Sequence, residues 1–178
     1  YQEGNKSSAL DNKASYLYGV KEIWHLRTVE GKNHIAVFEL QKRNDGYGVK
    51  GDNGGLDTNM TSYMLKKITL YAKKDYQLNG PNAYPIKTVH FTYDYTLCKN
   101  VENNNGDTVI VNGTNINANK GKLTLKSLYF TYGRSNKGRL SPYVFNYSDV
   151  NPSYDLKGND RWGYYKPNRG TYGLTGSP

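Results

Sequence analysis

Three histidines and a single cysteine are the first residues in this sequence to weigh for chemistry. His25 and His34 lie on either side of a Gly- and Asn-containing connection at residues 30–33, so the two rings are candidates to face each other across a hairpin. A metal site would need a third, acidic ligand at a defined place, and the sequence indicates none. Cys98 follows a strand-like stretch, which favours a buried, inert thiol over a nucleophile, because a nucleophile needs an identified base.

Acidic and amide side chains gather in one glycine-rich stretch, residues 43–59. Asp45, Asp52 and Asp57 supply oxygen atoms of the kind that Ca²⁺ prefers, but their spacing does not match the twelve-residue calcium loop. Turn chemistry explains the stretch better, so we expect a long loop, and calcium binding there stays an open alternative. The sequence contains no Gly-x-Ser-x-Gly elbow and no phosphate-binding loop. We therefore predict no catalytic residue, no cofactor and no enzymatic activity.

The composition of the chain favours a β-sheet. Of 178 residues, 18 are Tyr, 19 are Gly and 21 are Asn, and the net charge is +9. Asn, Gly, Tyr and Thr are poor residues for a helix interior, whereas Tyr packs well on strands. The aromatic content of 13% is too high for a disordered chain, and no run approaches the ~20 apolar residues of a membrane span. The positive charges are scattered, which indicates solvated strand faces more than a focused binding site.

Several stretches alternate apolar and polar residues with the period of two that is typical of a strand. Residues 20–28 and 34–42 are predicted to be the two arms of a first hairpin. Residues 65–71, 86–93 and 125–132 share the form apolar, Lys, polar, apolar, polar, apolar. Their unequal spacing argues against a solenoid of fixed period, so we expect repeated strand–turn–strand units in an irregular sheet.

The predicted fold class is therefore all-β, as an irregular antiparallel sheet of strand–turn–strand units or a β-sandwich-like arrangement. The Asn-rich stretch 100–119 interrupts the sheet as a long hairpin excursion around the apolar run 108–111. A turn follows the last repeated stretch, and residues 143–147 form a further strand.

We expect a single all-β domain or sheet segment at residues 16–166, after an N-terminal extension at 1–15 and before a flexible Gly/Pro/Tyr-rich tail at 167–178. The first residue is Tyr1 and no leader follows it, which we interpret as a processed product or a piece of a longer chain. The predicted sheet core consists of apolar and aromatic residues: Trp24, Ile68, Leu70, Val89, Phe91, Leu128, Phe130, Phe145 and Trp162.

A series of motifs, taken in their order along the chain, resembles very large secreted proteins of the Rhs/YD-repeat class of Gram-negative gut bacteria. The stretches that carry the resemblance are 19–26, 34–38, 65–68, 89–95, 121–125, 140–147 and 160–165. Strand pairs of the form Leu-Thr-x-Ile-x-x-x-Tyr and Leu-x-Pro-x-x-Phe-x-Tyr also resemble the sheet region of insecticidal toxin-complex B components. The family signature that precedes the cleaved tail, with its Arg-Tyr-Asp and Gly-Arg-Tyr elements, has no match here. The resemblance is therefore to an internal shell segment.

That resemblance implies a hollow shell of coiled antiparallel sheet that encloses a C-terminal toxin or effector. The strands of this chain would do structural work in a secreted or cell-surface protein of a Gram-negative bacterium, without catalysis of their own. The implied partner is the rest of a larger polypeptide. Because an internal sheet segment has unpaired edges, we also expect self-association at those edges.

Two other functions remain as alternatives. A carbohydrate-binding or adhesive module would use exposed aromatic rings to stack on sugar faces, and the candidates are Trp162, Tyr164 and Tyr165. Single-stranded nucleic acid, bound by basic strands with stacking aromatics, is the least favoured partner because the charges are not concentrated.

Overall fold

The structure, a computed structural model, describes residues 17–52, 54–98, 108–111, 114–117, 121–148, 162 and 164. The chain divides into two compact units, one of Gly19–Asn151 and one that combines Tyr1–Tyr18 with Pro152–Pro178. All described strands belong to the unit Gly19–Asn151. The domain bounds expected from the sequence stay a prediction.

The described part of this unit consists of strands, one short α-helix and two 3-10 helices. In chain order they are β1 (Thr28–Glu30), β2 (His34–Gly51), β3 (Gly54–Ala72), α1 (Lys73–Asn79), η2 (Gly80–Asn82), β4 (Pro85–Leu97), β5 (Thr108–Val111), β6 (Thr114–Asn117), β7 (Lys122–Tyr132), η3 (Lys137–Leu140) and β8 (Tyr143–Val144). No helix of this described set is long and apolar enough to cross a membrane.

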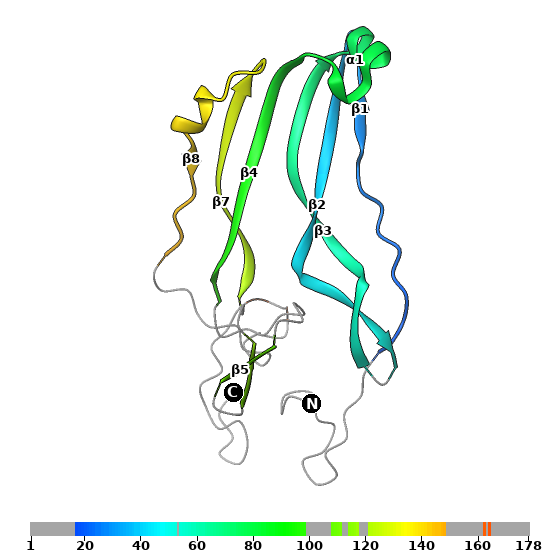
Figure 1. The fold of residues 1–178 in the computed structure, drawn as a ribbon, viewed down its shortest axis with the longest axis vertical. Helices are drawn as coiled ribbons and strands as arrows, with labels where there is room; N and C mark the ends of the chain where they lie inside the picture. The colour runs from blue at the N-terminus through cyan, green and yellow to red at the C-terminus, as the bar shows by residue number, and fades with distance from the viewer. Residues whose placement is uncertain are drawn as a thin grey trace. The chain divides into compact units, whose positions relative to one another are not determined.

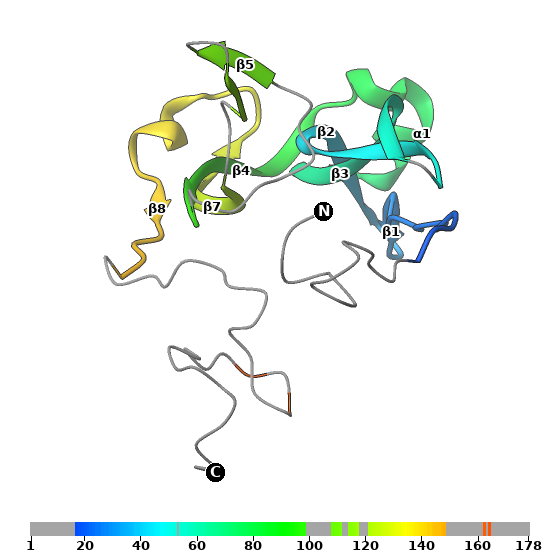
Figure 2. The ribbon, with the colours of Figure 1, turned by 90° about the horizontal axis from the view of Figure 1, so that it is seen from below.

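Six strands form one antiparallel sheet in the order β1-β2-β3-β4-β7-β8, and β5 pairs with β6 as a separate hairpin. Figure 1 shows the sheet face on, and in the end-on view of Figure 2 the strands follow one another from β8 at the left to β1 at the right. The sequence order of the strands is also their spatial order, as in a meander of hairpins. The predicted all-β class is confirmed, and so is a hairpin around residues 108–111 within the Asn-rich stretch.

The first predicted hairpin is shorter than expected. β1 begins only at Thr28 and pairs over three residues, with Glu30 opposite Ile35. Residues 19–27 are described without regular secondary structure and are exposed, so the prediction of a strand at 20–28 is wrong for most of its length. The connection itself is a tight turn in which the amide of Gly31 donates to the carbonyl of His34, at 2.9 Å.

The prediction of a long loop at residues 43–59 is wrong. β2 continues to Gly51 and β3 begins at Gly54, with those two glycines paired, so the stretch forms the far half of a long hairpin. The glycines that suggested a loop are needed for close strand approach: a Cβ on Gly48 would lie 2.6 Å from the Cβ of Met60. Positive φ angles occur at the turn, where Gly54 has φ +88°.

The sheet is continuous at one end and divided at the other. β3 pairs with β4 only where Lys67–Tyr71 meets Pro85–His90. Beyond that pairing, the hairpin β2–β3 and the hairpin β4–β7 diverge, as Figure 1 shows. The short helix α1 makes the connection at the continuous end, where the carboxylate of Asp75 accepts from the Asn79 side chain at 2.6 Å and the Tyr84 amide at 2.7 Å. The helix was not predicted.

Candidate functional site

One face of the sheet is apolar. Cross-strand pairs place Phe38, Ile68, Val89 and Phe130 in one row across four strands, because residues directly opposite each other point to the same side. We call this the apolar face, and it also carries Ala36, Leu70, Phe91, Leu128 and Tyr143. The period-two alternation in the sequence predicted this face.

The apolar face is only half-buried. Neither of the two buried hydrophobic residues among those described, Ile35 and Ala83, belongs to this face, and none of the described side chains is less than 2% exposed. Lys87 lies on the same face and places its ammonium 4.1 Å from the centre of the Phe130 ring, where a cation–π contact is favourable. The side chains of the apolar face therefore stay partly exposed, and another protein surface can bury them further.

Three predicted core residues lie elsewhere. Trp24 is 86% exposed in the irregular segment before β1, and Trp162 is 78% exposed. Phe145, just after β8, is 37% exposed. The core prediction is wrong for these three residues, because alternation alone does not reveal that a stretch has no partner strand on one side. Six of the predicted residues do lie on the apolar face, in the half-buried state just described: Ile68, Leu70, Val89, Phe91, Leu128 and Phe130.

The opposite face is mainly polar, although it also carries Ile35 and Val37, and we call it the polar face. Its central row runs Glu39, Lys67, His90 and Tyr129 from β2 to β7. The Glu39 carboxylate pairs with the Lys67 ammonium at 3.0 Å and with that of Lys66 at 3.2 Å. Partial burial alone would raise the pKa of Glu39, but the hydrogen bonds from the two lysines outweigh it and hold the pKa below its usual value.

His90 makes two close contacts on the polar face. Its ring stacks on that of Tyr129 with a centroid separation of 4.5 Å, and its Nε2 lies 2.9 Å from the hydroxyl of Thr131. Burial lowers the pKa of His90 and the nearby Lys67 lowers it further, against the opposing effect of Glu39. A histidine in contact with a threonine hydroxyl can act as the base that activates this nucleophile, but Thr131 is buried beneath its neighbours. The geometry therefore favours a packing role for His90 and Thr131 over nucleophile activation.

A second polar cluster bridges the divided end of the sheet. Residues 43–46 of β2 bulge opposite Ser62, because Lys42 pairs with Tyr63 and Tyr47 with Thr61. A bulge redirects side chains, and here Arg43 donates to the Asp45 carboxylate through Nε at 2.8 Å and Nη2 at 2.6 Å.

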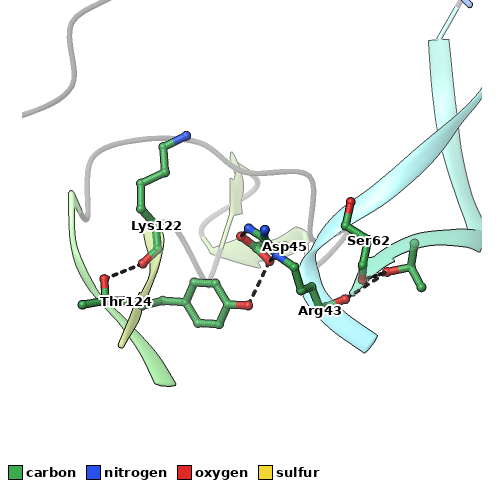
Figure 3. Close-up of polar contacts among 7 residues, drawn as sticks. Arg43, Asp45, Ser62, Lys122 and Thr124 are labelled. Atoms are coloured by element: carbon green, nitrogen blue, oxygen red, sulfur yellow. Dashed lines mark hydrogen bonds and ion pairs between the residues drawn. The ribbon is translucent and has the colours of Figure 1, made fainter. Parts of the chain in front are cut away.

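The hydroxyl of Tyr95 on β4 also donates to Asp45, at 2.9 Å, so this carboxylate joins the two diverging hairpins (Figure 3). Asp45 is 8% exposed. Burial alone would raise its pKa, but the hydrogen bonds from Arg43 and Tyr95 outweigh it and lower the pKa. Burial, with the Asp45 bond second, raises the pKa of Tyr95 to about 12. We call Arg43, Asp45 and Tyr95 the bridge cluster.

The sequence carried only part of the signal for the bridge cluster. Arg43 and Asp45 are two residues apart, which is the spacing of neighbours on one strand face, but the glycines around them predict a loop. Tyr95 lies far away in the sequence, and no local pattern links it to Asp45. Another acid of this stretch, Asp57, accepts instead from the backbone amide of Asn59 within β3, at 2.9 Å.

The histidines and the cysteine do not form a site in the described residues. The ring of His25 lies edge-on to Tyr63, with centroids 6.0 Å apart, while His34 opens β2 opposite Ala72, so the two histidines do not face each other. Cys98 is half-buried and adopts a positive φ of 53°. No group of three or more His, Cys, Asp or Glu side chains converges in a way that could hold a metal ion within the part of the chain described.

The predicted sugar-stacking residues are only partly described. Trp162 is highly exposed, as is Tyr164 at 73%, and Tyr165 lies outside the described residues. Stacking on a sugar by these rings stays a prediction. Comparison of the chain with protein-family models, with curated proteins and with solved structures found no match.

Proposed function

We propose that this chain is a structural β-sheet segment of a large secreted or cell-surface protein of the Rhs/YD-repeat kind, in which it helps to enclose or present a toxin or effector. The observation that carries the proposal is the half-exposed apolar face. A sheet must bury an apolar face against another layer to be stable, and the side chains in the centre of this face remain partly exposed in the described residues. A wall segment that is covered by its neighbours or its cargo satisfies that requirement.

The two faces also differ in the way that a shell wall requires. One carries the apolar row, and the other carries ion pairs and the packed Glu39–Tyr129 row. A wall has an inner and an outer surface in contact with different environments, so unlike faces support this role. The motif resemblance to shell-forming proteins supports it independently.

Labelling of single cysteines on the two faces tests the proposal. In a Cys98→Ser background, Val89→Cys places a thiol on the apolar face and Ser127→Cys places one on the polar face. Both variants are made in two forms. One is the whole protein encoded by the complete open reading frame, and the other is this chain alone. We expect a bulky polyethylene-glycol maleimide to label both sites in the chain alone but only one of them in the whole protein.

Equal labelling of both sites in the whole protein by the bulky reagent would contradict a closed shell. A small maleimide serves as the control, because it must reach both thiols after denaturation if the variants are intact. A reading frame that ends on both sides of this chain would also count against a larger shell.

Carbohydrate binding is the second candidate, and the exposure of Trp162 and Tyr164 favours it. A glycan array probed with the chain should then give a selective hit that Trp162→Ala and Tyr164→Ala abolish. Trp24→Ala is the matched control, since Trp24 is at least as exposed as these two residues but lies in a different segment. Loss of binding in the control variant as well would argue for nonspecific adhesion by aromatic rings.

A further inference from the structure

The two long hairpins are built on one plan. In the hairpin β2–β3, Phe38 lies opposite Ile68 and Glu39 opposite Lys67. In the hairpin β4–β7, Phe91 lies opposite Leu128 and Thr92 opposite Ser127. The first strand of each hairpin therefore carries a phenylalanine at the position where the second strand carries a branched aliphatic residue.

The hairpins also share an irregularity at the next position. The pairing steps from Glu39/Lys67 to Leu40/Leu65, so that Lys66 is the extra residue of a bulge. It steps in the same way from Thr92/Ser127 to Tyr93/Leu125, with Lys126 as the extra residue. We name β2 and β4 the Phe strands, and β3 and β7 the Leu-Lys strands.

This assignment corrects the repeat expected from the sequence. Residues 65–71 and 125–132 are equivalent, as predicted, but 86–93 belongs to β4, a Phe strand, and is equivalent to part of β2. Lysine at the second position of all three stretches concealed the difference. The better signal was the recurrence of Phe38, Phe91 and Phe145 at nearly equal intervals.

The edge strands continue the alternation. Val29 of β1 pairs with Ala36, Ile68 with Val89, and Leu128 with Tyr143 of β8, in equivalent registers. Residues 26–29, with the sequence Leu-Arg-Thr-Val, therefore match the Leu-Lys strands, and residues 143–145 match the Phe strands.

One backbone hydrogen bond occurs at equivalent positions in two of these strand pairs. The amide of Phe38 donates to the carbonyl of Arg27, and the amide of Phe145 donates to that of Lys126, both at 2.9 Å. Arg27 and Lys126 occupy the same position in their strands. The sheet thus consists of three successive units, each a Leu-Lys strand followed by a Phe strand.

Because the two strand types alternate, the two edges of the sheet are complementary. The strand that would extend the sheet beyond β8 is of the Leu-Lys type, and β1 is of that type. We propose that copies of this chain associate head to tail, with the β1 edge of one copy paired to the β8 edge of the next. This inference rests on the proposed role of the chain as a structural sheet.

The side chains at the two edges fit this arrangement. If the junction repeats the register of the β2–β3 hairpin, Phe145 lies opposite Val29 of the next copy, and Tyr147 lies opposite its Leu26. All four are exposed hydrophobic residues in the single chain, and the junction would cover them together. Such an interface uses different surfaces on the two copies, so it propagates head to tail, as an open chain or, if the rotation between copies closes, as a ring.

Salt dependence follows from the charge. Each copy carries a net charge of +9, so copies repel one another at low ionic strength. Added salt screens that repulsion, and association should increase with salt. Association that weakens as salt is added would indicate an electrostatic contact and would overturn the proposal.

Successive backbone amides of an edge strand point alternately into and out of the sheet, and this alternation shows how to block each edge separately. Because Phe38 bonds to Arg27 and Phe145 to Lys126, the amides of Thr28 and Val144 point away from the sheet. Thr28→Pro and Val144→Pro each remove an outward donor while the inner pairing is kept. Thr28→Val and Val144→Thr keep the amides and are the matched controls.

Sedimentation velocity over a concentration series tests the proposal. We expect the unmodified chain and both controls to form species that grow with concentration, and each proline variant to form none of these species. In a solution of one proline variant, every molecule has the same edge blocked. The other edge then finds no complementary edge to pair with, so each variant alone should be monomeric. An equimolar mixture of the two should form a one-to-one dimer and nothing larger.

Three results would overturn the proposal: a monomeric unmodified chain at all concentrations and salts, a homodimer of either proline variant, or no dimer in the mixture. Should a proline variant lose its strand-type circular dichroism, Val29→Lys and Phe145→Lys block the same edges through their side chains, with the same expectations. Failure here would leave the labelling of the two faces in the whole protein unaffected, so the two proposals fail separately.

Discussion

Asp45 is the residue on which the divided end of the sheet most depends. It is a buried carboxylate with a bidentate guanidinium partner and a phenolic donor from another hairpin. Removing the carboxylate leaves Arg43 and Tyr95 without their shared acceptor in a partly buried site. The cost of that loss exceeds the net value of the bonds themselves.

We therefore expect Asp45→Ala to lower the free energy of unfolding by about 1–3 kcal/mol, because Arg43 and Tyr95 lose their acceptor. Urea unfolding followed by circular dichroism measures the change. Glu22→Ala is the control, since Glu22 is exposed and should change stability by less than about 0.5 kcal/mol. An equally small effect at Asp45 would show that the bridge cluster does not hold the hairpins together.

Tyr95 should make stability fall at alkaline pH. Its pKa is raised from about 10 in an unfolded chain to about 12 in the folded protein. A raised pKa means that the stabilisation is fully present below about pH 10 and is lost as the pH rises through 12. Urea unfolding across that range should show a steeper loss in the unmodified chain than in Tyr95→Phe.

Tyr63→Phe provides the comparison for this pH effect, because it removes an exposed phenol on β3. Its alkaline profile should follow that of the unmodified chain. If Tyr95→Phe follows it as well, the hydrogen bond to Asp45 does not contribute to the pH dependence.

At the scale of elements, the long hairpin β2–β3 shows how glycine can mislead. Gly46 and Gly48 lie in a strand whose partner approaches so closely that a Cβ would meet Ser62 at 2.9 Å or Met60 at 2.6 Å. In the sequence the same residues resemble a turn-rich loop, because glycine also readily adopts the positive φ angles that many turns require. Only pairing with β3 distinguishes the two uses.

Gly48→Ala should destabilise the hairpin by about 1–3 kcal/mol, since the added methyl group forces the strands apart. Gly51→Ala is the matched control in the same strand, where a Cβ would meet nothing within 4 Å. Thermal unfolding of both variants compares them directly. Equal melting temperatures would mean that the strands accommodate the methyl group by a small shift.

At the scale of the whole molecule, the decisive property is the half-buried apolar face. A phenylalanine in a closed core loses about 3–5 kcal/mol when it is cut back to alanine. Phe91 is half-buried on an open face, so less contact is available to lose.

We expect Phe91→Ala to cost roughly 1–2 kcal/mol in the chain alone, well below that core range. Urea unfolding gives the value, with Tyr132→Ala as an exposed control on the same face. A loss of about 4 kcal/mol would reveal that a further layer covers this face in solution. In the whole protein, where the proposed shell buries the face, the same substitution should have the larger effect.

The sequence by itself determined the class of the fold and most of its strands. Alternation at 34–42, 65–71, 86–93 and 125–132 is a local property of neighbouring residues, and all four stretches are strands of one sheet. The hairpin at 108–111 was also predicted, because an apolar run bounded by Asn and Gly favours a strand between turns.

The tertiary structure alone decided which residues meet. It brought Tyr95 to Asp45, left Trp24 and Phe145 exposed, extended β2 and β3 through the predicted loop, and separated the Phe strands from the Leu-Lys strands by their register. Period-two alternation states that a residue points to one side of a strand. It does not state which strand lies beside it or where a bulge shifts the pairing, because those depend on contacts between residues far apart in the chain.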